Sequence, residues 1–268
     1  MGFSRFIGAA VLILFILLLA HSSPAQLDRL RRSKSLEPVA DNPMVEIPAG
    51  EFVMGFEGTQ ALEDERPLHR VWLDAFSIDV YEVTTAQYAA FLAAETRAAP
   101  WQWETVDLMQ HGDRPVIGVN WHDAEAFCRW KGRRLPSEAE WEKAARGTDE
   151  RLYPWGNQSP TKEFANFALG ARFSYNQVLF PVGSHERGRS PYGLYHMAGN
   201  VYEWVQDWYA TNYYEISPDR NPHGPAQGQF KVLRGGSWSD LPKYLLTYGR
   251  FKLPPETRNS YIGFRCAK

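Results

Sequence analysis

The stretch VLRGGSWSDLPKYLLTYGRF, Val232 to Phe251, contains the most informative motif of this chain. A Gly-Gly-Ser turn stands between an apolar start and a run of aromatic residues, a composition typical of an active-site wall. The stretch has no cysteine and no histidine, and its one acidic residue is Asp240. Whether it is a catalytic site, a site without its catalyst, or plain structure depends on what the rest of the chain supplies.

The overall composition is that of an ordinary globular protein. The 268 residues are 44% hydrophobic and 22% charged, and the formal net charge is −2, so nothing in the totals favours binding to nucleic acid. Ten tryptophans and 13 tyrosines are many for this length. We interpret them first as the core of a loop-rich fold, and second as the lining of a binding face.

Residues 1–25 have the layout of a secretory signal peptide. Arg5 precedes an apolar run at 6–20, and Ser23 and Ala25 stand at positions −3 and −1 of a cleavage site. The run is shorter than the roughly 20 residues that span a membrane, so we expect cleavage. Anchoring in the inner membrane by residues 6–20 is the alternative. Both predict an exported protein, periplasmic or extracellular.

The rest of the chain divides into a linker and one domain. Residues 26–43 are polar and charged with little periodicity, whereas residues 44–268 are globular in composition throughout. Export bears on the only two cysteines, Cys128 and Cys266, because an oxidising compartment permits a disulfide. A reactive thiol pair is the alternative, although neither cysteine lies in a CxxC motif or beside an evident base.

Apolar periodicity and turn residues predict short strands near the start of this domain. Residues 44–55 alternate around a Pro-Ala-Gly turn, which predicts a β-hairpin. Residues 69–84 predict two further strands. The last 120 residues are rich in Gly, Pro and aromatic residues, which indicates short strands and long ordered loops.

Three helices are predicted between these regions. They are expected in residues 84–95 with a capping box of Thr84 and Gln87, in 122–132 with Asp123 as the cap, and in 136–147 with a capping box of Ser137 and Glu140. In the second helix, Ala124, Phe127 and Cys128 share one face, so Cys128 is expected to point inward.

Seven segments carry a resemblance to a known family. They are IPAGEFVMG (47–55), YEVTTAQYAAFL (81–92), RRLPSEAEWEKAARG (133–147), YPWGN (153–157), SPYGLYHMAGNVYEWVQDWY (190–209), VLRGGSW (232–238) and IGFRCAK (262–268). In this order they resemble the formylglycine-generating enzyme family, also called sulfatase-modifying factors. The resemblance covers nearly all of 44–268. It implies one α+β domain, related to C-type lectins and low in regular secondary structure, and a structural disulfide between Cys128 and Cys266.

The resemblance also implies where catalysis would reside. In enzymes of the family, two cysteines bind copper, three and eight residues after the serine of the Gly-Gly-Ser motif. Counting from Ser237, this chain has Asp240 and Leu245 at those places. Because Cu(I) needs soft thiolate ligands, we expect no copper and no oxidase activity by the family's mechanism.

Other residues match the wall of the family's pocket. The pocket candidates are Trp204, Ser237, Asp240 and Tyr244. The alternative is that these residues are kept because the loop packs on them.

The resemblance further implies structural calcium. One site would use side-chain oxygens of Asn200 and Glu203 with the carbonyls of Gly199 and Val201, since hard oxygen ligands suit Ca²⁺. The alternative is that Glu203 pairs with a nearby arginine.

A second family calcium site is only partly matched. Asn166 and Phe167 are present, but Ser174 or Asn176 stands where an acidic residue is expected.

The sequence therefore predicts an exported family member that acts as a protein-binding or accessory factor for an exported or membrane-associated protein or peptide. One alternative is a periplasmic maturation enzyme with other chemistry, as in pyoverdine maturation, with Glu203, Asp240 or Tyr244 transferring a proton. A formylglycine-generating oxidase acting by another route is a second. A structural subunit of a membrane complex is a third.

Overall fold

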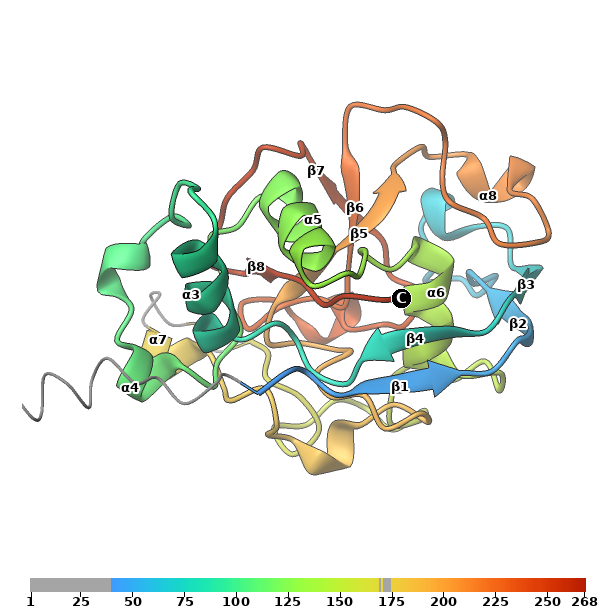
Figure 1. Ribbon diagram of the computed structural model, residues 1–268. Coiled ribbons are helices and arrows are strands. Elements are labelled where there is room, and N and C mark those ends of the chain that lie inside the picture. The colour runs from blue at the N-terminus through green and yellow to red at the C-terminus, as the bar shows by residue number, and fades with distance from the viewer. Residues whose placement is uncertain (1–39, 169, 171–174) are drawn as a thin grey trace, which may run out of the picture. The chain divides into compact units, whose positions relative to one another are not determined.

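The largest sheet has four strands in the order β7-β6-β5-β8 (Figure 1). Its strands are β5 (Tyr202–Trp208), β6 (Lys231–Arg234), β7 (Phe251–Leu253) and β8 (Ile262–Gly263). Strands β5, β6 and β7 are antiparallel neighbours, whereas β8 runs parallel to β5. The computed structural model describes residues 40–168, 170 and 175–268, so the predicted signal peptide and nearly all of the predicted linker lie outside the described residues.

Two smaller sheets replace the hairpin predicted for residues 44–55. Strand β1 (Met44–Ile47) pairs with β4 (Phe76–Asp79), and β2 (Gly50–Met54) pairs with β3 (His69–Leu73), both antiparallel. The two strands in 69–84 are thus confirmed, but the hairpin is wrong. The physical reason is core formation: in the observed pairing, all four strands contribute apolar side chains to one buried cluster, and burying this area outweighs the local hairpin pattern.

Helices and 3-10 turns connect these sheets. The α-helices are α3 (Thr85–Ala94), α4 (Leu108–His111), α5 (Trp121–Trp130), α6 (Glu138–Arg146), α7 (Tyr175–Val178) and α8 (Tyr213–Ile216). The 3-10 turns are η1 (Glu63–Glu65), η2 (Trp103–Thr105), η3 (Glu186–Gly188) and η4 (Pro242–Tyr244). Among the helices of the described residues, the three longest, α3, α5 and α6, are those that the sequence predicted.

The capping boxes of α3 and α6 are confirmed, with Thr84 and Ser137 as the N-cap residues. The cap predicted for α5 is wrong. Asn120 is the N-cap, and its Oδ1 accepts from the backbone N of Asp123 at 2.9 Å. In turn, Oδ2 of Asp123 accepts a hydrogen bond from the backbone N of Asn120 at 3.1 Å. Asp123 therefore occupies the third helical position, where its negative charge also interacts favourably with the positive end of the helix dipole.

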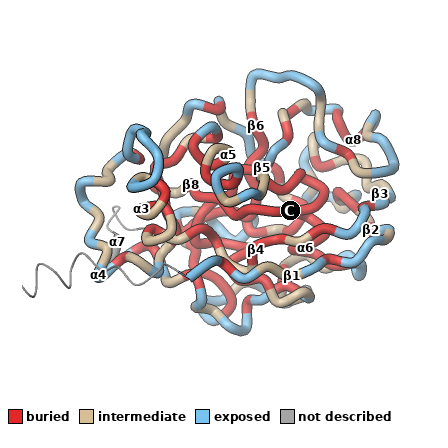
Figure 2. The backbone as a smooth tube through the Cα atoms, in the orientation of Figure 1, coloured by how far each residue is buried: buried red, intermediate tan, exposed pale blue. Residues whose placement is uncertain are grey.

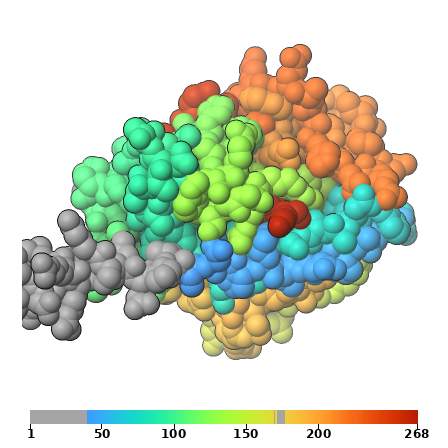
Figure 3. Space-filling view, in the orientation of Figure 1, coloured from blue at the N-terminus to red at the C-terminus, as the bar shows by residue number. Residues whose placement is uncertain are grey.

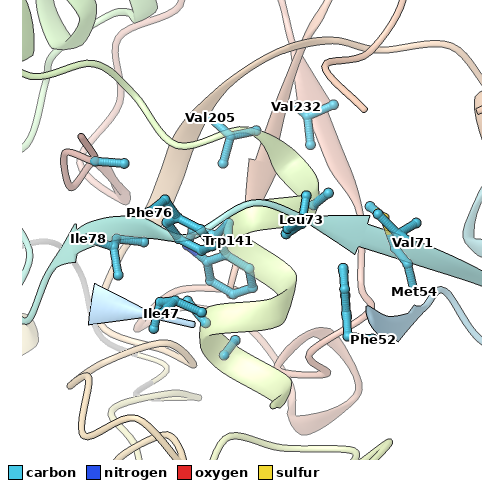
Figure 4. Close-up of a cluster of buried hydrophobic side chains, with 14 of the residues drawn as sticks. Ile47, Phe52, Met54, Val71, Leu73, Phe76, Ile78, Trp141, Val205 and Val232 are labelled. Carbon is cyan, nitrogen blue, oxygen red and sulfur yellow. The ribbon is translucent and has the colours of Figure 1, made fainter. Parts of the chain in front are cut away.

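One half of the core surrounds α6. Trp141 is completely buried, and the close-up shows it among side chains from β1, β4 and the central sheet (Figure 4). The tube coloured by burial shows that β5, β6 and α6 are mostly buried, whereas the connection that precedes β6 is mostly exposed (Figure 2).

The other half of the core packs α3 and α5 against β5, β6 and β8. The predicted disulfide between Cys128 in α5 and Cys266 after β8 is confirmed, with a Cα–Cα distance of 5.6 Å. Both sulfurs are fully buried, so the reactive thiol pair is not formed. The C-terminal end then reaches the surface, where it is visible in dark red (Figure 3).

Candidate binding pocket and the altered copper positions

Two buried arginines hold the Val232–Phe251 loop against α6. Arg234 lies at the start of the loop and donates to Glu142 at 2.6 Å and to Glu138 at 3.2 Å. Arg250 lies near its end and donates to both oxygens of Glu138, at 2.7 and 3.0 Å. All four side chains are at least nine-tenths buried. Removing one member of such a pair would leave an uncompensated buried charge, so the loop is firmly positioned at both ends.

The Gly-Gly turn allows the loop to fold back on itself. Gly235 and Gly236 both have positive φ, +93° and +73°, a region that favours glycine. A Cβ atom on Gly236 would lie 2.7 Å from the carbonyl oxygen of Tyr244. The turn brings Ser237 beside Asp240, whose Oδ2 accepts from the Ser237 backbone N at 3.0 Å and from its hydroxyl. Burial raises the pKa of the Asp240 carboxyl.

The two positions matched to the copper cysteines are closed to a soft metal. Leu245 is fully buried in a cluster with Ala165, Phe167 and Ala198. Asp240 is engaged by Ser237. The chain has two cysteines in all, and both are in the disulfide. No thiolate can therefore be offered to Cu(I) at this loop.

A cavity of about 410 Å³ opens beside the loop. Its lining residues are Gln60, Leu62, Glu65, Tyr202, Lys243, Tyr244, Leu246, Gly249, Arg250 and Phe251. Most of the walls are aromatic or aliphatic, with Glu65 and Arg250 as deep polar residues. Three of the exposed large apolar side chains, Leu62, Tyr244 and Phe251, line this cavity. Such a hollow with a few convergent polar groups fits a binding site.

The structure separates the four pocket candidates. Tyr244 lines the cavity and is 43% exposed, whereas Ser237 and Asp240 are not among the lining residues. Trp204 is fully buried, and its Nε1 donates to the Val119 carbonyl at 3.2 Å. The aromatic residue that β5 does present to the cavity is Tyr202, which is not among the residues predicted from the sequence.

Tyr202 stacks on Phe251 with 5.0 Å between ring centroids. The available signal was its strand position, two residues before Trp204, since residues two apart share a face of a strand.

The residues predicted to bind calcium lie in a buried polar cluster. Both oxygens of Glu203 accept from Arg265, at 2.7 Å each, and Oε2 also accepts from Trp141 Nε1 at 2.9 Å. The carboxylate of Glu203 is therefore satisfied by an arginine, as the alternative interpretation held. The side chain of Asn200 bridges Glu82 and Asn166, at 2.8 and 3.0 Å.

Two acceptors of this cluster have no hydrogen-bond partner among the described residues. They are Oε1 of Glu82 and Oδ1 of Asn166. Burial raises the pKa of Glu82 well above its usual range, and the nearby Glu203 raises it further. The donor set is hard and oxygen-only, which fits Ca²⁺, but the fit depends on Glu82 and Asn166 more than on Glu203. Of the second predicted site, Ser174 and the side chain of Asn176 lie outside the described residues.

Within residues 40–168, 170 and 175–268, no three or more His, Cys, Asp or Glu side chains are grouped so as to hold a metal. No helix in these ranges is long and apolar enough to cross a membrane. Residues 6–20 lie outside them.

Fold and loop together define a class: an α+β domain with little regular secondary structure, whose Gly-Gly-Ser loop borders a pocket and lacks cysteines at the copper positions. The model of the sulfatase-modifying factor enzyme 1-like domain matches residues 32–268. The chain belongs to this family, and the predicted fold is confirmed.

Known proteins similar to this chain have different names. The formylglycine-generating enzyme of Mus musculus is 32% identical over 92% of this chain and 82% of its own length. A Chlamydia caviae protein named serine/threonine-protein kinase pkn1 is 38% identical over 84% of this chain, which spans only 38% of that protein. The solved structure of PvdO from Pseudomonas aeruginosa superposes with a TM-score of 0.70 and 29% identity, covering 84% of this chain and 93% of that one. Proteins that are similar to this chain in sequence or in fold therefore have different names.

Proposed function

We propose that this protein is an exported member of the family without copper oxidase activity, and that it binds a protein or peptide partner in the cavity beside Tyr244. The observation that carries the proposal is the chemistry of the loop: Leu245 and Asp240 stand at the copper positions, and the disulfide consumes both thiols. The walls around Tyr202, Tyr244 and Phe251 remain available for binding.

Absence of oxidase activity is tested directly. The protein, supplied with copper and oxygen, is incubated with a sulfatase peptide containing the CxPxR motif, and the cysteine is followed by mass spectrometry. We expect no formylglycine, with an active formylglycine-generating enzyme as the positive control. Conversion by the purified protein would refute the proposal.

Partner binding is tested by crosslinking in the producing cells. A photoreactive amino acid replaces Tyr244, which is 43% exposed at the cavity. A matched control places it at Met109, which is 93% exposed and does not line the cavity. We expect a defined partner to crosslink from position 244 and not from position 109. Identical patterns from both positions would contradict use of this cavity.

The competing candidate is a maturation enzyme with other chemistry on the same scaffold. Its support is the half-buried Asp240, which has a raised pKa and a hydrogen bond from Ser237, a combination suited to proton transfer. Asp240→Asn and Tyr244→Phe should then fail to complement a deletion phenotype, while Leu241→Ala, a change at an exposed neighbour, should succeed. Full complementation by the first two variants would exclude this candidate.

Calcium belongs to the same proposal as a structural ion near Asn200. Glu82 and Asn166 would supply side-chain oxygens, and the carbonyls of Gly199 and Val201 would be candidates to complete the set. The ion would neutralise the Glu82 carboxylate, which has no ion-pair partner among the described residues.

Metal analysis of protein purified without chelator should find about one calcium per chain. Adding Ca²⁺ at about 100 times its Kd to chelator-treated protein should stabilise it by about 2.7 kcal/mol. A Glu82→Gln variant should lose this response.

A further inference from the structure

The cavity beside Tyr244 contains a buried carboxyl group without an ion pair. Glu65 is 5% exposed and lines the cavity. Its Oε2 accepts from the backbone N of Leu62 at 2.8 Å, and no cation pairs with it among the described residues. Burial raises the pKa of Glu65 and the neighbouring Asp64 raises it further, whereas the backbone N–H groups of Leu62 and Arg250 and the nearby Arg234 lower it. A ligand that brings a positive charge would therefore be favoured at this depth.

The two cations of the lining leave this charge uncompensated. Arg250 donates to both oxygens of Glu138 and, at 2.7 Å, to the carbonyl of Asp64, so its guanidinium group is already satisfied. Lys243 is exposed at the rim, where its Nζ lies 4.9 Å from the centre of the Tyr244 ring. That contact shows that the face of Tyr244 accepts an ammonium group.

A neighbouring hollow extends the acidic character of the site. It shares Leu62, Arg250 and Phe251 with the cavity and is also lined by Glu63 and Asp64. These two acidic residues make no ion pair with any described residue. Lys252, on the same hollow, lies with its Nζ 3.8 Å from the centre of the Tyr209 ring. The turn η1, with three consecutive acidic residues, thus gives one wall a negative charge that a cationic partner complements.

The strand beside the cavity has a free edge. Strand β7 is the last strand of the central sheet and pairs with β6 on one side only. Within the described part of the chain, no segment pairs with its outer edge. Phe251 and Lys252 in this strand are exposed, and Phe251 lines the cavity. An extended peptide could hydrogen-bond to this edge while one of its side chains enters the cavity, as in β-strand addition.

We propose that the cavity binds a lysine side chain of a partner protein, presented by an extended segment that pairs with the outer edge of β7. The aliphatic stem of the lysine packs on Leu62, Leu246 and Phe251, and its ammonium group lies between Glu65 and the aromatic rings. This inference rests on the proposed function and specifies the partner's chemistry.

The test uses the purified full chain and short acetylated, amidated peptides of Ser and Thr with one central residue. The central residue is lysine, or norleucine, which has a similar stem without the ammonium group. A third peptide carries the lysine and N-methyl groups on alternate backbone amides, and n-butylamine represents a free amine. Binding is measured by NMR titration. We expect the lysine peptide to bind roughly tenfold more tightly than each of the other three ligands.

Variants assign the effect to the cavity. Glu65→Gln keeps an acceptor for the backbone N of Leu62 and should weaken the lysine peptide roughly tenfold, leaving the norleucine peptide unchanged. Tyr244→Ala, at an exposed position, should weaken both. Leu241→Ala is the matched control, because Leu241 is 57% exposed and does not line the cavity, and it should change neither.

Each contrary outcome overturns a stated part of the inference. Equal binding of the lysine and norleucine peptides refutes the cation preference but leaves the proposed peptide-binding function standing. If the N-methylated peptide binds as tightly as the lysine peptide, pairing with β7 is refuted. If n-butylamine binds as tightly as the lysine peptide, the cavity is a small-amine site and the peptide partner is refuted. Absence of binding by every ligand refutes the inference, whereas the proposed function is judged separately by crosslinking from position 244.

Discussion

The disulfide between Cys128 and Cys266 should supply a large part of the stability of this domain. The two cysteines are 138 residues apart, and in the chain-entropy model a closed loop of that length lowers the entropy of the unfolded chain by the equivalent of about 5 kcal/mol. That is comparable to the whole free energy of unfolding of a marginal domain. We expect the variant Cys128→Ala/Cys266→Ala to lose about this amount.

The assay is urea unfolding followed by tryptophan fluorescence. With a slope of about 2 to 3 kcal/mol per molar urea, the expected loss lowers the midpoint by about 2 M. Wild-type protein unfolded in reductant should show a similar shift, which controls for the loss of two buried sulfur atoms. Reductant should have no effect on the variant. A loss below about 1 kcal/mol would refute the reasoning, because it would mean that the unfolded chain is restricted without the crosslink.

Two further predictions concern buried charges and can be measured by the same unfolding assay. Burial lowers the pKa of His196 to about 3. Below about pH 6.5 His196 is therefore protonated in the unfolded chain and neutral in the folded chain. As the pH falls from 6.5 towards 3, the free energy of unfolding should decrease by about 1.4 kcal/mol per pH unit. The variant His196→Asn should lose this part of the pH dependence between pH 7 and 5; equal slopes would contradict it. Arg265→Leu leaves the buried carboxylate of Glu203 unpaired and should cost about 3 to 5 kcal/mol. Arg220→Leu removes an exposed ion pair with Asp74 and should cost less than about 1 kcal/mol; equal costs would show that burial does not matter here.

Local signals in the sequence predicted what depends on neighbours a few residues apart. The capping boxes of Thr84 and Ser137 are confirmed because each needs only a partner three residues on. The error at α5 has the same origin, since Asn120 and Asp123 are both good caps and the apolar pattern does not distinguish them. The absence of cysteine at positions 240 and 245 was also visible in the sequence.

Pairings between distant segments were decided by the tertiary structure. Residues 44–55 have a hairpin pattern, yet β1 pairs with β4 and β2 with β3, and in this arrangement all four strands contribute apolar side chains to one buried cluster. The cavity likewise joins Glu65 and Tyr202 with the loop after β6. No local pattern marks such residues, since their environment is built from parts of the chain that meet only on folding.

By itself, then, the sequence determined the helices α3, α5 and α6, the family and the missing thiolates, because each follows from residue type at a short or recognisable spacing. The resemblance to the family also implied the disulfide, which the structure confirms. The tertiary structure alone decided which charges are satisfied. Glu203 pairs with Arg265, 62 residues away in the sequence, and Arg250 pairs with Glu138, 112 residues away. Glu65 forms no ion pair with any described residue and accepts from the backbone N of Leu62. Burial makes these differences large, because a charge removed from water is stabilised only by the partners that the fold places beside it.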